Sequence, residues 1–181
     1  MSASRPVHVE REETALSAAW RVVERIRQVH ALEHATLWVL AEQFPQRTLG
    51  GLSTDRGFFV YGDIDAGVLL RAAHRALERI NQGEDHLAVH PQCGTNLSVG
   101  LLVTAGLGFA ASLVLPRRPL PQLLGVGASA LAAVELARSL GTLAQRHLTT
   151  ALPRNLEIIG VQTLTDWSGR HNHFVQTRFV G

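Results

Sequence analysis

The apolar residues of this chain are concentrated in one long stretch, and the charged residues lie mainly on either side of it. Residues 97–115 contain no charged side chain, and a helix of this length can cross a hydrocarbon core of about 30 Å. A second apolar stretch, 120–137, contains one charged residue, Glu135. Pro116-Arg117-Arg118-Pro119 separates the two stretches. We predict a transmembrane helical hairpin over 97–137, the alternative being a buried hairpin in a larger soluble assembly.

Two further helices are predicted in the polar part of the chain. The first spans about residues 13–43 and ends at Phe44-Pro45, because proline disfavours a helical residue before it. The second spans 66–81, with apolar residues at helical spacing and Asp65 as its N-terminal cap.

Short runs of apolar and β-branched residues predict a small β-sheet. Residues 58–61 are expected to form one strand, and residues 156–164 and 173–180 a β-hairpin that pairs with it. The glycine-rich residues 49–57 are typical of a loop. The predicted fold class is therefore mainly α with a small β-sheet (α+β), together with the two-helix transmembrane hairpin.

These elements divide the chain into four segments. We expect a flexible arm over 1–12, a helical, histidine-rich domain over 13–96, the transmembrane hairpin over 97–137, and a C-terminal segment with the β-hairpin over 138–181.

The net charge and the number of cysteines limit which classes of function are possible. The formal net charge is +2, too small to indicate nucleic acid as a partner. The single cysteine, Cys93, excludes an intrachain disulfide framework. Met1–Thr14 is too polar for a signal peptide, so insertion is expected to depend on the internal apolar segments.

The residues that indicate chemistry are His30, Glu33 and His34. The two histidines are one helical turn apart and interrupt the apolar, core-facing side of the first helix, with Glu33 at its edge. Buried imidazole and carboxylate groups need partners, and a divalent ion is a suitable one. The His-x-x-Glu-His spacing predicts two zinc ligands, with Glu33 as the general base for a metal-activated water.

A further ligand is expected from the polar turn over 84–96, which contains His90 and Cys93. If only one of them binds, the metal keeps an open position and hydrolysis is possible. If both bind, the site is closed and structural. In the metal-free alternative, His30 and His34 bond to Glu33, Asp85 or the backbone, and Cys93 is a small core residue.

Two stretches, His30 to Thr36 (HALEHAT) and His90 to Asn96 (HPQCGTN), resemble signatures of an uncharacterised family of small bacterial membrane proteins, known only as a domain of unknown function. The resemblance covers about residues 20–140 and implies a membrane location without an activity. The local His-x-x-Glu-His string also resembles inverzincin metallopeptidases, which are larger soluble enzymes with a glutamate as third ligand. Neither Glu78 nor Glu84 matches that spacing here.

Two hypotheses result. The first is a membrane-anchored zinc protein, with hydrolase or peptidase activity as a possibility. The second is a non-enzymatic assembly or interaction protein whose His/Cys cluster is structural or binds a cofactor such as haem. In both, the chain lies in the bacterial inner membrane, and the arginines flanking the hairpin favour both termini in the cytoplasm. The expected partners are the lipid bilayer and a second copy or another membrane protein.

Overall fold

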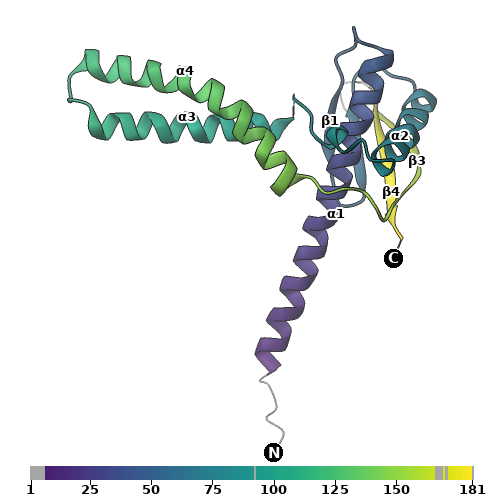
Figure 1. The fold of residues 1–181 in the computed structure, drawn as a ribbon. Helices are drawn as coiled ribbons and strands as arrows, with labels where there is room; N and C mark the ends of the chain where they lie inside the picture. The colour runs from purple at the N-terminus through teal and green to yellow at the C-terminus, as the bar shows by residue number, and fades with distance from the viewer. Residues whose placement is uncertain (1–6, 92, 166–168, 170, 181) are drawn as a thin grey trace, which may run out of the picture. The chain divides into compact units, whose positions relative to one another are not determined.

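The computed structural model describes residues 7–91, 93–165, 169 and 171–180 of the chain. The chain divides into two compact units. The first comprises residues 1–88 and 150–181, and the second residues 89–149. Together they contain long helices and one four-stranded antiparallel sheet, so the mainly helical α+β class is confirmed (Figure 1).

Helix α1 (Val7–Gln43) belongs to the first unit, and its N-terminal part extends away from the sheet (Figure 1). It begins six residues before the predicted start, so residues 7–12 of the expected arm are helical. Its C-terminal part supplies core residues such as Val29, Leu32 and Leu40, none of which is exposed. Trp20, in the N-terminal part, is 65% exposed. The helix ends at Gln43, immediately before Phe44-Pro45, as predicted.

The sheet has the strand order β1 (Gly50–Ser53), β2 (Gly57–Tyr61), β4 (His171–Phe179), β3 (Leu156–Thr165). The predicted hairpin and its pairing with the strand around Phe58 are both confirmed. The prediction of a loop over 49–57 is wrong in part, because residues 50–53 form β1. Glycine disfavours strands, but the ladder with β2 gives these residues backbone partners.

Side chains alternate between the two faces of the sheet. Phe58, Val60 and Val175 are fully buried and join the core formed with α1 and α2 (Ala66–Asn81). Asp65 caps α2 as predicted, since its Oδ1 accepts hydrogen bonds from the backbone N–H groups of residues 67 and 68. The core therefore lies between the two helices and one face of the sheet.

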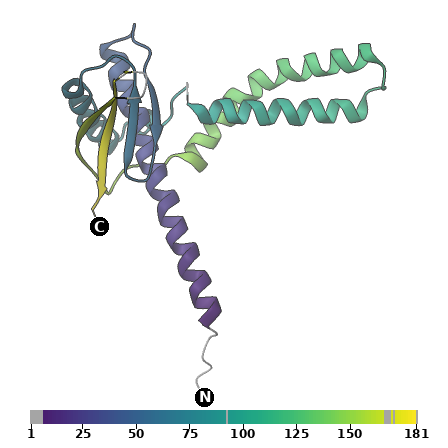
Figure 2. The same ribbon diagram turned by 180° about the vertical axis from the view of Figure 1, so that it is seen from behind.

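The second unit is a helical hairpin. Helices α3 (Gly94–Val114) and α4 (Pro119–Ala144) lie side by side (Figure 2), and a π-helical turn, η2 (Gln145–Thr149), follows α4. Both helices are long and apolar enough to cross a membrane, and the most apolar window of α3 has no buried residue.

Each helix of the hairpin is longer than predicted. Helix α3 begins three residues before Leu97, and α4 continues seven residues beyond Ala137. The apolar pattern ends where side chains become small or polar, but a helix can include such residues when they pack against its neighbour.

Candidate functional site

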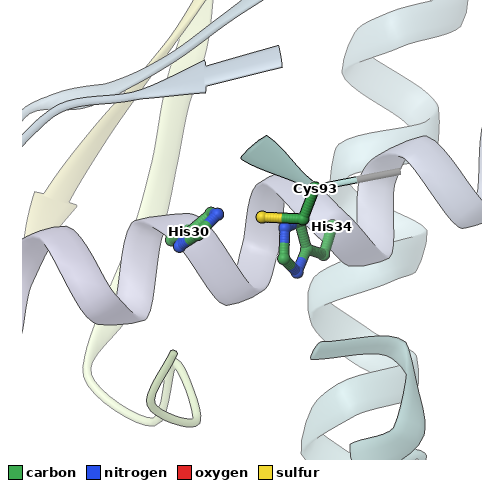
Figure 3. Close-up of side chains that lie close together, drawn as sticks. All are labelled: His30, His34 and Cys93. Atoms are coloured by element: carbon green, nitrogen blue, oxygen red, sulfur yellow. The ribbon is translucent and has the colours of Figure 1, made fainter. Parts of the chain in front are cut away.

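His30 and His34 lie on consecutive turns of α1, and the four-residue spacing places both imidazoles on the same face (Figure 3). Their ring centroids are 4.3 Å apart and their planes are inclined by 60°. His34 is 1% exposed, whereas His30 is half-buried. The neighbouring Ala31 and Ala35 are fully buried. The pair therefore lies at the margin of the core, where two imidazoles can face a common ligand.

A hydrogen bond to the backbone of Ala88 orients His34. Its Nδ1 lies 2.7 Å from the carbonyl oxygen of Ala88. A carbonyl only accepts, so Nδ1 carries a proton, and in the neutral imidazole Nε2 carries the lone pair. Metal-binding histidines commonly donate their second ring nitrogen in this way. The bond to Ala88 thus leaves His34 in the tautomer that a metal ion requires.

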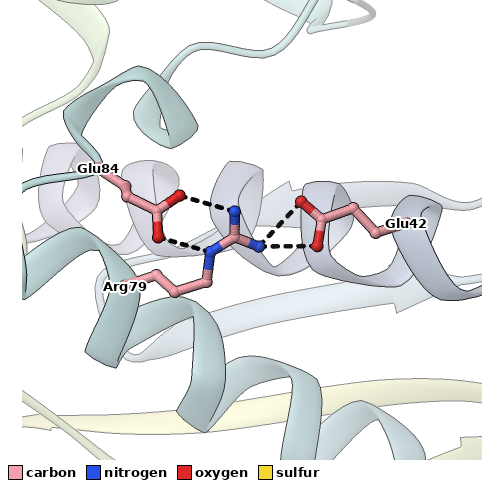
Figure 4. Close-up of polar contacts among 3 residues, drawn as sticks. All are labelled: Glu42, Arg79 and Glu84. Carbon is pink, nitrogen blue, oxygen red and sulfur yellow. Dashed lines mark hydrogen bonds and ion pairs between the residues drawn. The ribbon is translucent and has the colours of Figure 1, made fainter.

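Ala88 is the last residue of the 3₁₀ helix η1 (Asp85–Ala88), which lies within the polar turn predicted over 84–96. An ion-pair network precedes it (Figure 4). Arg79 of α2 donates to both oxygens of Glu42 on α1, at 2.8 and 2.9 Å, and to both oxygens of Glu84, at 2.7 and 2.9 Å. Leu87 N–H in turn donates to the Glu84 carbonyl at 3.0 Å. The network therefore ties η1, and the carbonyl that His34 uses, to both helices.

The hydrogen bonds of this network shift the pKa values of its charged groups. The hydrogen bond from Arg79 lowers the pKa of Glu84 below its ordinary value, and the two carboxylates raise the pKa of Arg79. Both groups are consequently ionised at neutral pH.

Glu33 is 5% exposed and contacts β1. The Ser53 hydroxyl donates a hydrogen bond to its Oε2. An ideal Cβ added to Gly51 would lie 2.2 Å from its Oε1, so glycine leaves the space that the carboxylate occupies. Sequence reasoning missed both Gly51 and Ser53, because they are about twenty residues from Glu33 and only the fold brings them to it.

His90 and Cys93 belong to the second unit. The backbone N–H of Cys93 donates to the His90 carbonyl at 3.2 Å, which closes a tight turn. Cys93 caps α3, because its Sγ accepts a hydrogen bond from Thr95 N–H at 3.4 Å.

Helix α1, the sheet and an apolar hairpin define a small α+β protein whose two hairpin helices are long and apolar enough to span a membrane. Comparison with known proteins gives its family. A model described as a domain of unknown function, DUF6391, matches residues 25–161, and the chain belongs to this family.

One relative is the uncharacterized protein SYNPCC7002_A1392 of Picosynechococcus sp. (strain ATCC 27264 / PCC 7002 / PR-6). It is 48% identical over 163 residues, which cover 85% of this chain and 80% of the relative. No solved structure matches the chain.

Proposed function

We propose that this protein is a membrane-anchored metal-binding protein in which His30, His34 and Cys93 hold a zinc ion. The observation that carries the proposal is the hydrogen bond from His34 Nδ1 to the Ala88 carbonyl. It prepares a largely buried imidazole to offer Nε2 to a metal, and the ring of His30 lies one turn away.

The donor set supports zinc among the divalent ions. The proposed ligands His30, His34 and Cys93 offer two imidazole nitrogens and one thiolate sulfur. Two imidazoles and one thiolate suit a borderline-soft ion, whereas magnesium and calcium prefer oxygen ligands. Because Cys93 lies in the second unit, its binding to the same ion as His30 and His34 is itself proposed.

Three protein ligands leave one position for water or substrate, as in catalytic zinc sites. The second unit offers His90 as a fourth ligand, which would close the site and make it structural.

The membrane part of the proposal is supported by α3 and α4. Helix α3 is long and apolar enough to cross a membrane, and its most apolar part has no buried residue. A helix with apolar residues on all sides is stable in lipid or inside a large assembly. We propose that the hairpin lies in the bilayer, with both termini in the cytoplasm. Carbonate washing of the membrane fraction tests whether the hairpin is inserted in the bilayer. Reporter fusions to either terminus test whether both termini are cytoplasmic.

Hydrolysis is a second candidate function, favoured by Glu33. Zinc bound beside this residue would make a coordinated water acidic. Glu33 would accept the proton, and the Ser53 hydroxyl would hold its carboxylate in position. The same carboxylate also contributes to packing against Gly51, so activity must be measured separately from stability.

The test is elemental analysis of the detergent-purified protein and of its variants. We expect about one zinc per chain in the wild type and a clear loss in His34→Ala. His74→Ala is the matched control, because His74 is an exposed histidine on α2. A wild-type protein with much less than one transition metal per chain, or a His34→Ala variant that keeps its metal, would refute the proposal.

Cobalt substitution tests the sulfur ligand. A cobalt–thiolate absorption band should be present in the wild type and in His74→Ala, and absent in Cys93→Ser. If the band is absent from the wild type, Cys93 is not a ligand. Glu33→Gln tests hydrolysis, since it should keep the metal and lose turnover of a model ester or peptide.

A further inference from the structure

The second unit contains a buried amide, that of Gln145, which follows α4 and is 0% exposed. Its Oε1 accepts a hydrogen bond from the backbone N–H of His90 at 2.8 Å, and its Nε2 donates to the His90 carbonyl at 3.1 Å. Nε2 also donates to Oδ1 of Asn96 at 2.8 Å. One side chain thus holds both backbone groups of His90, the first residue of the turn that ends at Cys93.

Asn96 extends this network to the other side of the turn. Its Nδ2 donates to the Pro91 carbonyl at 2.8 Å, and its backbone N–H donates to the Cys93 carbonyl at 2.9 Å. His90 and Pro91, which precede the cysteine, are therefore anchored to this pair of amide side chains.

A glycine near the C-terminal end of α4 leaves space for the side chain of Asn96. Gly141 is buried, and a Cβ added there would lie 2.1 Å from Oδ1 of Asn96 and 3.2 Å from its backbone Cα. Gln145 also begins the π-helical turn η2. Such turns are rare and occur often at functional sites, because the wider turn redirects side chains.

We propose that Gln145 and Asn96 are positioning residues that hold the Cys93 thiol in the orientation needed to ligate the metal. The inference rests on the proposed function and extends it from the ligands to their support. Neither amide is one of the proposed ligands. They act through the backbone of His90, Pro91 and Cys93, as the outer hydrogen-bond partners of metal sites do.

Gln122 provides a matched control at the opposite end of the same hairpin. Its Nε2 donates to the carbonyl oxygens of Leu115 and Pro116 at 3.1 and 3.3 Å. If these amides serve only to close the ends of the hairpin, replacing either glutamine should have similar consequences. If Gln145 positions a ligand, only its replacement should change the metal site.

The experiment compares Gln145→Leu with Gln122→Leu in full-length, detergent-solubilised protein. Zinc affinity is measured by competition with a chelator, and the cobalt–thiolate band by absorbance. We expect Gln145→Leu to bind zinc about 10- to 100-fold more weakly, with a weakened or shifted cobalt band. Gln122→Leu should match the wild type. Equal affinities in the two variants would overturn the inference and leave the proposed function intact.

Two additions keep the test decisive. If Gln145→Leu does not fold, Asn96→Asp removes the Nδ2 donor but keeps the oxygen that Gln145 uses, and it should also weaken zinc binding. If the wild type binds no metal, the proposed function fails, but the positioning of Cys93 is still measurable. Iodoacetamide should then alkylate Cys93 several-fold faster in Gln145→Leu than in the wild type or Gln122→Leu. Equal rates would overturn the inference.

Discussion

Replacing Gly51 by alanine tests how β1 holds Glu33. The added Cβ would lie 2.2, 2.6 and 2.8 Å from Oε1, Cδ and Cγ of Glu33. Ordinary van der Waals contact begins at about 3.4 Å, so the carboxylate must move by about 1.2 Å. Because Glu33 is only 5% exposed and accepts a hydrogen bond from Ser53, this movement breaks the bond or displaces the strand.

The expected loss of stability follows from the Ser53–Glu33 hydrogen bond that the substitution disturbs. A hydrogen bond to a charged side chain contributes about 1.5–3 kcal/mol. Gly51→Ala should therefore lower the free energy of unfolding by about that amount. Gly50→Ala is the matched control on the same strand, because no atom lies within 4 Å of its added Cβ. There alanine should be neutral or stabilise the protein by up to about 1 kcal/mol, since it restricts the unfolded chain.

The assay is urea unfolding followed by tryptophan fluorescence, which reports on the core because Trp38 packs against it. A double-mutant cycle with Ser53→Ala locates the effect. If Gly51→Ala acts by breaking the Ser53–Glu33 bond, its cost should fall by at least about 1 kcal/mol in the Ser53→Ala background. Strictly additive costs, or a Gly51→Ala variant as stable as Gly50→Ala, would refute this account of Glu33.

Three other measurements follow from the structure. Arg79→Met should lower the melting temperature most at neutral pH. The lowered pKa of Glu84 means that its ion pair stabilises the fold above the ordinary carboxylate range, about pH 4, and loses this effect as the pH falls through the folded-state pKa. A difference from wild type that does not shrink on acidification would contradict this. Gly141→Ala should destabilise the hairpin, because the added Cβ would clash with Asn96. Gly127→Ala is the control and should not, because no atom lies within 4 Å of its added Cβ. Equal melting temperatures of the two variants would contradict this. If the protein binds zinc as proposed, zinc at 100 times its Kd should stabilise it by about 2.7 kcal/mol. A chelator should then lower the melting temperature by about 5–10 °C, and zinc but not magnesium should restore it.

The fold was predictable where the sequence pattern is periodic and each element has its own signals. The cap of α2 at Asp65, the end of α1 before Pro45 and the pairing of the C-terminal hairpin with the strand at Phe58 all follow from such signals. Strand β1 was not predictable in this way. Gly50 and Gly51 favour a loop by composition, and they form a strand because β2 offers backbone partners. The helix ends at Gly94 and Ala144 were missed because the apolar pattern ends before the helices do.

The candidate site was predictable only in its local part. A spacing of four residues is sufficient to place His30 and His34 on one face, because the helix repeats every 3.6 residues. The partners of these groups lie far away along the chain. Ala88 is 54 residues from His34, and Ser53 is 20 residues from Glu33. Backbone carbonyls and small residues leave no signal in a single sequence, so the hydrogen bond that sets the tautomer of His34 emerges only from the fold.

The position of Glu33 on α1 also bears on its role. At 100° per residue, His34 is rotated by about 40° from His30, whereas Glu33 is rotated by about 60° in the opposite direction. The carboxylate therefore flanks the imidazole pair, and in this fold β1 occupies that flank. A general base must keep its carboxylate oriented toward water, and a structural carboxylate must satisfy a buried donor. The hydrogen bond from Ser53 to Oε2 is compatible with either role, because it can orient a catalytic carboxylate or satisfy a buried structural one. The Ser53 contact therefore explains why Glu33 can be buried. Glu33→Gln separates the two roles, because it should abolish turnover only if the carboxylate is the general base.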